Sequence, residues 1–167
     1  MENQNVYAEL AAFGKELLSH KQLDGGLPVI ADYLKRLTGA MRCSIFIYDK
    51  ETMELWTILA NGVERIVVPV NKGIVGHIFM EKKAIIENNV AHNPYFLKEV
   101  DKDSGYETVN MLGCPIYNAA SQQVIGVLQL INKTSGFNDR DMQFINVIIR
   151  FIGSFIELSC AYRESEH

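Results

Sequence analysis

Cysteine and histidine are the residue types in this chain best suited to redox, nucleophilic or metal chemistry. They occur as Cys43, Cys114, Cys160, His20, His77, His92 and His167. No two cysteines form a C-x-x-C pair, and the histidines lack the spacing of metal ligands. Cys43 and Cys114 stand within apolar strand-like stretches and Cys160 within a helix-like one, which is typical of structural thiols. We therefore expect no metal site, no disulfide framework and no catalytic centre.

Phosphate-binding chemistry has one weak candidate, the segment Gly73-Ile-Val-Gly76. Backbone N–H groups at the start of a helix can bind an anion. The same glycines can simply form a turn, and the sequence leaves both interpretations open. Lys133-Thr134 lacks the preceding glycine-rich segment of a phosphate-binding loop, so no nucleoside triphosphate site of that type is predicted.

Composition and charge narrow the class of protein. The chain has 167 residues, 48% of them hydrophobic, and a formal net charge of −4, which suits one domain with a core of its own. Lysine and arginine are scattered, so we expect no nucleic-acid partner. The apolar stretch 144–162 contains Asn146, Arg150 and Glu157, which argues against membrane insertion. The unpaired cysteines and the absence of a signal peptide favour the cytoplasm.

The segment Val124–Lys133 is predicted to be a central strand. Valine, isoleucine and leucine occupy both alternating sets of positions, which is the pattern of a strand covered on both faces. Gln129 is the exception. Because an unsatisfied buried amide costs about 1–3 kcal/mol, we expect this side chain to be hydrogen-bonded or to face a cavity.

Hydrophobic periodicity and turn residues predict the helices and strands of the chain. The first two helices should be separated by a break at Gln22–Gly26, with Pro28 in the first turn of the second. Asn138 and Asp141 have the spacing of a capping box at the start of the last helix. The polar segment 88–108 is long for a loop in a compact domain, which favours a functional role. Helices are expected at 3–19, 27–37, 73–82 and 138–163, and strands at 43–48, 53–60, 65–70, 84–87, 109–117 and 123–132.

The last helix is apolar around more of its circumference than one sheet contact requires. Its apolar residues run from Phe144 to Leu158 and spread over roughly 220°, whereas about 100° suffices to cover a sheet. We therefore expect two buried faces. One would lie on the sheet, and the other could take the N-terminal helix, the same helix of a second subunit, or both.

Seven blocks of sequence, in a fixed order, point to a family. They are Cys43–Asp49, Val68–His77, Asn93–Phe96, Val100–Asp101, Ser104–Thr108, Leu112–Ile116 and Val124–Lys133. Together they resemble GAF domains, and more narrowly those of cyclic-nucleotide phosphodiesterases and related adenylyl cyclases. The resemblance implies an α+β, PAS-related fold. A six-stranded antiparallel sheet would have the N- and C-terminal helices packed on one face and a ligand pocket on the other, under the long loop.

The resemblance also implies a set of ligand-binding positions. In cyclic-nucleotide-binding relatives these positions surround the ligand, and here they are Ser44, Ala60, Asn61, Val75, Asp101, Ser104, Thr108 and Gln129. Ser44, Asp101 and Thr108 match the relatives, and Ser104 keeps a hydroxyl. Ala60 removes a ring that could stack on a base, whereas Asn61 and Gln129 replace carboxylates. The ligand implied is a cyclic nucleotide or another small molecule, with no certain cofactor.

A second motif implied by the resemblance is structural. The phosphodiesterase-type domains carry N-K-x(n)-F-x3-D-E, which stands here as Asn132-Lys133, Phe137 and Asp141, with Met142 in place of the glutamate. An ion pair between Lys133 and Asp141 would join the end of the central strand to the start of the last helix. We interpret these four residues as a structural clamp.

The function implied is that of a sensory or regulatory domain in a signal-transduction protein. Pocket occupancy would bias the packing of terminal helices across a parallel homodimer, and an output domain of a parent protein, such as a two-component histidine kinase, would read that change. The alternative is a dimerisation and signal-transmitting domain without a ligand. Some GAF proteins reduce free methionine sulfoxide with pocket cysteines, but the corresponding region has none here, so we expect no enzyme.

The same resemblance divides the chain. We expect an N-terminal helix and connector at 1–26, the GAF domain at 27–163, including the C-terminal helix 138–163, and a tail at 164–167.

Overall fold

The computed structural model describes residues 2–58, 65–96 and 107–165. Each expected helix and strand is present, with small differences at the ends. The helices are α1 (Glu2–Leu18), α2 (Leu23–Thr38), α3 (Gly73–Glu81) and α5 (Asp139–Ser165), with a 3-10 turn η1 (Val90–His92). The strands are β1 (Arg42–Asp49), β2 (Glu54–Ile58), β3 (Arg65–Pro69), β4 (Ile85–Glu87), β5 (Met111–Tyr117) and β6 (Val124–Ile131).

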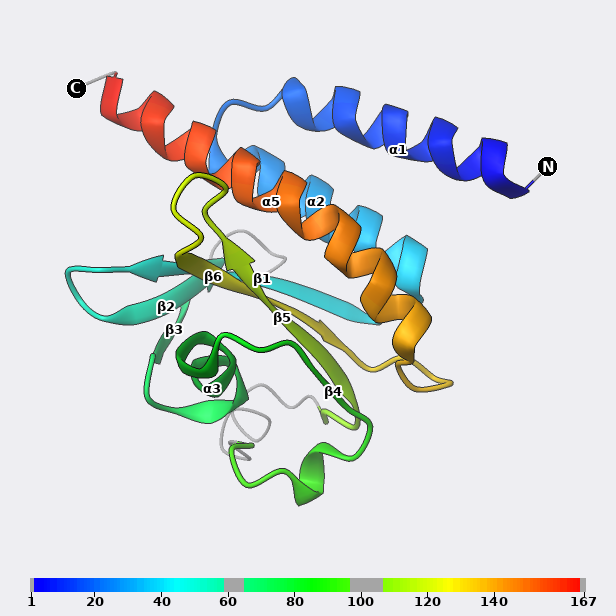
Figure 1. Ribbon diagram of the computed structural model, residues 1–167, viewed down its shortest axis with the longest axis vertical. Coiled ribbons are helices and arrows are strands. Elements are labelled where there is room, and N and C mark those ends of the chain that lie inside the picture. Colours follow the sequence, from blue (N-terminus) through cyan, green and yellow to red (C-terminus); the bar gives the residue numbers. More distant parts are fainter. Residues whose placement is uncertain (1, 59–64, 97–106, 166–167) are drawn as a thin grey trace.

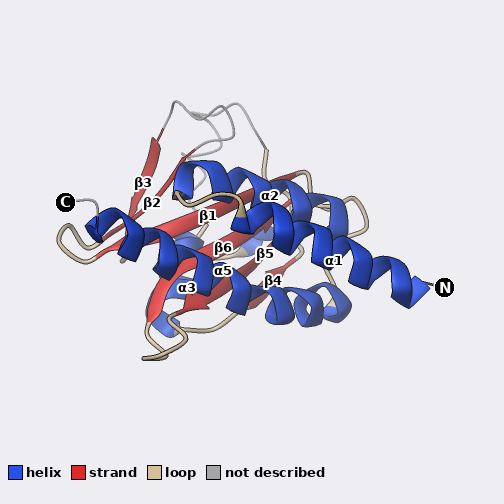
Figure 2. Ribbon diagram, turned by 90° about the horizontal axis from the view of Figure 1, so that it is seen from above, coloured by secondary structure: helices blue, strands red, loops and turns tan. Residues whose placement is uncertain are grey.

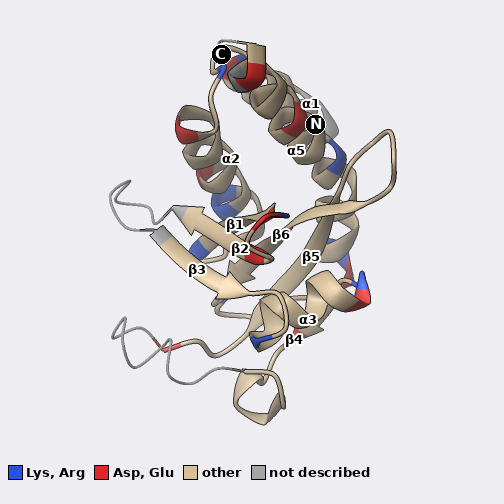
Figure 3. Ribbon diagram, turned by 90° about the vertical axis from the view of Figure 1, so that its left-hand side faces the viewer, with Lys and Arg blue, Asp and Glu red and all other residues tan. Residues whose placement is uncertain are grey.

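The six strands form one sheet in the order β3-β2-β1-β6-β5-β4. Every neighbouring pair is antiparallel. Helices α2 and α5 cover one face, with α1 lying over them, and α3 lies on the opposite face (Figures 1 and 3). The expected α+β architecture is therefore confirmed.

The alternation of side chains along β1 and β6 builds a core on each face of the sheet. On the helix face, Ile45 and Leu128 join the cluster that contains Ile152 of α5. On the α3 face, Phe46 and Val127 pack with residues of α3. Since β6 also lies between β1 and β5, the prediction of a central strand covered on both faces is confirmed.

Helix α2 begins earlier than its sequence indicates. The expected break at Gln22–Gly26 is wrong, because the helix starts at Leu23 and carries Pro28 in its interior. Packing overrides the local signals here. Leu23 is buried, and a Cβ atom at Gly26 would lie 1.9 Å from the Phe155 ring of α5. The glycine therefore allows α2 and α5 to approach closely, and the expected domain boundary at residue 27 falls within a continuous helix.

Helix α1 packs on α2 rather than on the sheet (Figure 2). Apolar side chains of both terminal helices stay exposed. The Phe13 ring stacks on Tyr33 of α2, with centroids 4.2 Å apart. The exposed residues are Tyr7 and Leu18 of α1 and Val147, Phe151 and Leu158 of α5. We call the α5 residues the α5 stripe. Their spacings of four and seven place them on one side of the helix.

Helix α5 also has, within the described residues, the length and composition of a membrane span. One face of it is buried in the core, where Ile145, Ile148 and Ile152 are at most 1% exposed. Packing within the domain therefore accounts for much of its apolar composition.

Candidate functional site

Two polar side chains lie next to each other in the middle of the sheet. Ser44 of β1 pairs with Gln129 of β6, and Gln129 pairs with Gly113 of β5 on its other side. Both polar side chains are only partly buried. Within the described part of the chain, neither side chain has a hydrogen-bond partner. One of the two alternatives predicted for Gln129, a hydrogen bond, is therefore not found among the described residues, and the side chain is partly accessible instead.

The pair belongs to the face of the sheet that carries α3. Side chains along a strand alternate between faces, and Ser44 and Gln129 each lie two residues from a member of the α3-side core, Phe46 and Val127. Gly113 gives independent evidence, because a Cβ atom there would lie 2.2 Å from Cδ1 of Ile78 in α3. Helix α3 thus covers the β5 side of this row and leaves Ser44 and Gln129 partly accessible.

The other expected binding residues divide into two groups. Val75 of α3 is buried in the α3-side core, and Thr108 is partly buried just before β5. Ala60, Asn61, Asp101 and Ser104 lie outside the described residues. The structure therefore brings Ser44 and Gln129 together, with Val75 on the helix that packs against the same face.

The ion pair expected between Lys133 and Asp141 is present. The Lys133 Nζ atom lies 2.7 Å and 2.8 Å from the two carboxylate oxygens, and the two side chains are 17% and 10% exposed. The capping box is also present: Asn138 N donates to Asp141 Oδ2, and Asp141 N donates to Asn138 Oδ1. Asp141 therefore serves as the partner of Lys133 and as part of the N-terminal cap of α5.

Asn132 has a role beyond that expected. Its backbone φ is 61°, in the left-handed region. Its Oδ1 atom accepts hydrogen bonds from Val109 N and Asn110 N, and its Nδ2 atom donates to Glu107 O. All of these bonds go to the segment that enters β5, so this side chain joins the end of β6 to residues 107–110.

Asn88 and Asn110 complete the same network, and sequence reasoning missed both. Asn110 donates to Lys133 O and accepts from Lys133 N. Asn88, just after β4, donates to Phe137 O and accepts from Phe137 N. The only available signal was an asparagine at each strand end. We call Asn88, Asn110, Asn132, Lys133 and Asp141 the polar junction.

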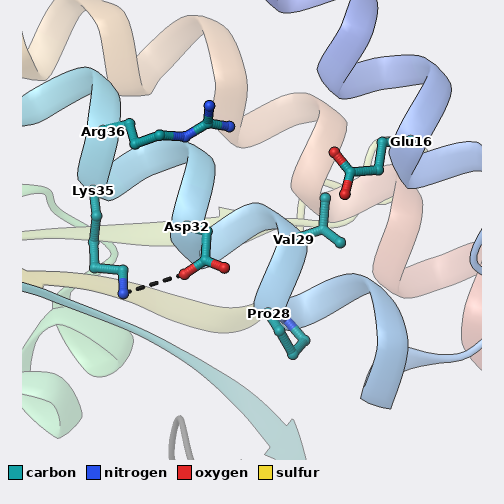
Figure 4. Close-up of a pocket in the computed structure, with 6 residues that line it drawn as sticks. All are labelled: Glu16, Pro28, Val29, Asp32, Lys35 and Arg36. Atoms are coloured by element: carbon teal, nitrogen blue, oxygen red, sulfur yellow. Dashed lines mark ion pairs between the residues drawn. The ribbon is translucent and has the colours of Figure 1, made fainter.

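An open depression lies on the helical side of the molecule, between α1 and α2 (Figure 4). It is lined by Glu16, Pro28, Val29, Asp32, Lys35 and Arg36. Asp32 and Lys35 form an ion pair of 3.2 Å there. None of the expected binding residues lines this depression, so it is separate from the polar pair on the α3 face.

Two of the three cysteines, Cys43 and Cys114, lack the features of reactive thiols. Desolvation raises the pKa of Cys43 to about 12, and it raises the pKa of Cys114 to about 11. Both are therefore protonated at neutral pH, whereas the thiolate is the nucleophilic form. Among the residues that the structure describes, no group of three or more histidine, cysteine, aspartate or glutamate side chains could hold a metal ion.

Comparison with protein families gives a clear result. The model of the GAF domain matches residues 22–156. The chain belongs to the GAF family. GAF domains are typically parts of signalling or regulatory proteins, which agrees with the class of function expected from the sequence.

Solved structures agree on the GAF fold at low sequence identity. The GAF domain of a phosphoenolpyruvate-protein phosphotransferase from Coxiella burnetii superposes with a TM-score of 0.82 at 18% identity, covering 96% of this chain and 98% of that one. A methyl-accepting chemotaxis protein fragment gives 0.73 at 19%, covering 88% and 96%. A free methionine-R-sulfoxide reductase from Neisseria meningitidis, in complex with its substrate, gives 0.72 at 15%, covering 92% and 89%.

Proposed function

We propose that this GAF domain is a sensory or regulatory module that binds a small molecule on the α3 face. The observation that carries this proposal is the Ser44–Gln129 pair, which is partly accessible and has no hydrogen-bond partner among the described residues. Because both side chains are partly accessible, their donors and acceptors can form hydrogen bonds with a ligand. The chemotaxis and phosphotransferase proteins with the same fold support a role in signalling.

The ligand class follows from the groups at the pair. The Gln129 amide offers a donor and an acceptor, and the Ser44 hydroxyl offers both in one atom. Neither is charged, so the ligand group that meets them needs complementary hydrogen bonds rather than an opposite charge. A cyclic nucleotide could meet this requirement through its base, as could another small metabolite with an amide or hydroxyl edge.

The terminal helices would transmit the ligand-binding signal to an output domain. We propose a parallel homodimer in which the α5 stripe packs against its copy, since an exposed apolar stripe at helical spacing suits a second helix. Ligand binding must favour one helix arrangement over the other, because equal affinity for both shifts nothing. An output domain in the parent protein would respond to that change.

We propose a non-catalytic role in the cytoplasm. The reductase with this fold raises the alternative of thiol chemistry. The raised pKa values of Cys43 and Cys114 speak against it. All three cysteines are free, which suits a reducing compartment.

The ligand proposal predicts a thermal shift that depends on Gln129. In a screen of cyclic nucleotides, purines and small metabolites, we expect at least one compound to stabilise the wild type. At one hundred times its Kd the gain would be about 2.7 kcal/mol, which raises Tm by roughly 5–10 °C. Gln129→Leu should abolish the shift, whereas Gln143→Leu, an exposed position on α5, should keep it. If no compound stabilises the wild type, the sensor proposal fails.

The second candidate function, dimerisation without a ligand, is favoured by the same α5 stripe. Light scattering should give a dimeric mass for the wild type and a monomeric mass for Phe151→Glu, which places a charge in the stripe. Arg150→Glu, next to the stripe and exposed, should remain dimeric. Leu158→Cys should form a disulfide between subunits, because a parallel pairing brings equivalent positions together. A monomeric wild type at high concentration would contradict both the sensor dimer and this alternative.

A further inference from the structure

We propose that the polar junction couples two parts of the domain. A change in the backbone at residues 107–110 alters the first turn of α5, and a change in the first turn of α5 alters residues 107–110. This proposal rests on the proposed function, in which ligand binding is the signal that the junction transmits. The coupling itself can be measured without a ligand. It also gives positioning roles to Asn88 and Asn110, which lie outside the family motif.

The first step of the coupling is the hydrogen bonding of the Asn132 side chain to the segment before β5. Its side chain bonds to Val109 N at 2.8 Å and to Glu107 O at 2.7 Å. Asn132 has a φ of 61°, in the left-handed region that asparagine adopts more readily than most residues other than glycine, and its side-chain bonds add to this preference. When residues 107–110 move, Asn132 loses these side-chain bonds, which help to fix its conformation.

The second step is the fixed position of Lys133, the next residue. Asn110 binds the backbone of Lys133 on both sides, through Lys133 N and Lys133 O at 2.9 Å each. The far end of the Lys133 side chain binds the Asp141 carboxylate. Movement of Asn110 or rotation at Asn132 therefore displaces the lysine that neutralises the cap of α5.

The third step is the stiffness of the connection to α5. Asn88 holds Phe137 N and Phe137 O at 2.9 Å and 3.0 Å, and the Phe137 side chain is buried in the helix-side core. Gly136 has a φ of 78°, and a Cβ atom there would lie 3.1 Å from Asn88 Oδ1. The segment between Lys133 and Asp141 is thus held in place at Phe137. A displacement of Lys133 therefore changes the position of Asp141, because this segment cannot easily change shape to compensate.

The location of the junction makes the coupling useful. Asn132 follows Gln129 by three residues and lies just after the end of β6, and Thr108 stands within the segment that Asn132 binds. At the other end, Asp141 caps the helix that bears the α5 stripe. The polar junction thus lies between the proposed ligand site and the proposed dimer contact.

Backbone hydrogen exchange of the ligand-free protein tests the coupling in both directions. Asn132→Gly keeps the left-handed backbone accessible and removes only the side-chain bonds. We expect it to speed exchange at Asp141 and Met142 in α5 by about tenfold, while Leu128 in the centre of the sheet exchanges at its wild-type rate. Because coupling is reciprocal, Asp141→Asn should speed exchange at Val109 and Asn110 by a similar factor.

The matched control is Asp139→Asn, an exposed acid in the same first turn of α5. It should leave Val109 and Asn110 unchanged, which separates coupling through the polar junction from a general loss of charge at the helix start. If Asn132→Gly leaves α5 unchanged, or Asp141→Asn leaves Val109 and Asn110 unchanged, the coupling proposal is overturned. A thermal-shift screen without a hit would instead count against the ligand proposal alone.

Discussion

Replacing Lys133 with methionine is expected to lower the free energy of unfolding by about 3–5 kcal/mol. The Asp141 carboxylate is only 10% exposed, so loss of the ammonium leaves a nearly buried charge without its partner. The loss corresponds to a fall in Tm of roughly 10 °C for a chain of this length. Urea unfolding monitored by circular dichroism would measure it.

A double substitution separates the unpaired charge from the loss of packing. Asp141→Asn removes the charge and keeps an oxygen that can accept the bond from Asn138 N. The Lys133→Met/Asp141→Asn protein should therefore be more stable than Lys133→Met alone. If Lys133→Met instead costs less than about 1 kcal/mol, the pair behaves as an exposed surface pair, and its interpretation as a clamp is wrong.

Replacing Gly153 with alanine is expected to destabilise the protein by about 1–3 kcal/mol, the usual cost of overpacking. Gly153 faces β5, and a Cβ atom there would lie 2.4 Å from the Tyr117 carbonyl oxygen. A backbone atom cannot move aside as a side-chain tip can, so α5 must shift away from the sheet. Thermal unfolding would measure the loss.

The same substitution at Gly14 should have the opposite sign. A Cβ atom at Gly14 meets nothing within 4 Å, and alanine stabilises a helix interior by about 0.5–1 kcal/mol relative to glycine. Gly14→Ala therefore controls for helix propensity. Equal effects at the two positions would mean that the close approach of α5 to β5 does not decide the result at Gly153.

Local patterns were sufficient to predict most of the fold. Both alternating sets of β6 are apolar, which predicted its central position, and the spacing of Asn138 and Asp141 predicted the cap of α5. The start of α2 could not be predicted in this way. It depends on the contact between Gly26 and Phe155, residues far apart in sequence, whereas Pro28 and the adjacent glycines locally indicate a break.

The candidate site was predicted in part, for a related reason. Gln129 was conspicuous as the one amide in an apolar strand, and family resemblance added Ser44, which the register places directly beside it. Asn88 and Asn110 were missed because their partners, Phe137 and Lys133, lie 49 and 23 residues away. Hydrogen bonds between side chain and backbone at such separations leave no periodic trace in a sequence.

Three features of the domain combine in the proposed function. Ser44 and Gln129 on the α3 face have no hydrogen-bond partner among the described residues, the polar junction joins the neighbouring segments to α5, and the α5 stripe is exposed. The proposed sensory role depends on the proposed ligand site, which requires that a small molecule bind at Ser44 and Gln129.

Methyl NMR of the isotope-labelled protein can test for binding at Ser44 and Gln129, because the two faces of the sheet carry separate methyl groups. On addition of a stabilising compound from the screen, or of cyclic GMP, cyclic AMP and guanine in turn, we expect shifts at Met111, Val127 and Val75 on the α3 face. Ile45 and Leu128, on the helix face, should change little. If the shifts are centred instead on Val29, in the depression between α1 and α2, or if no compound causes shifts, the proposed ligand site on the α3 face is wrong.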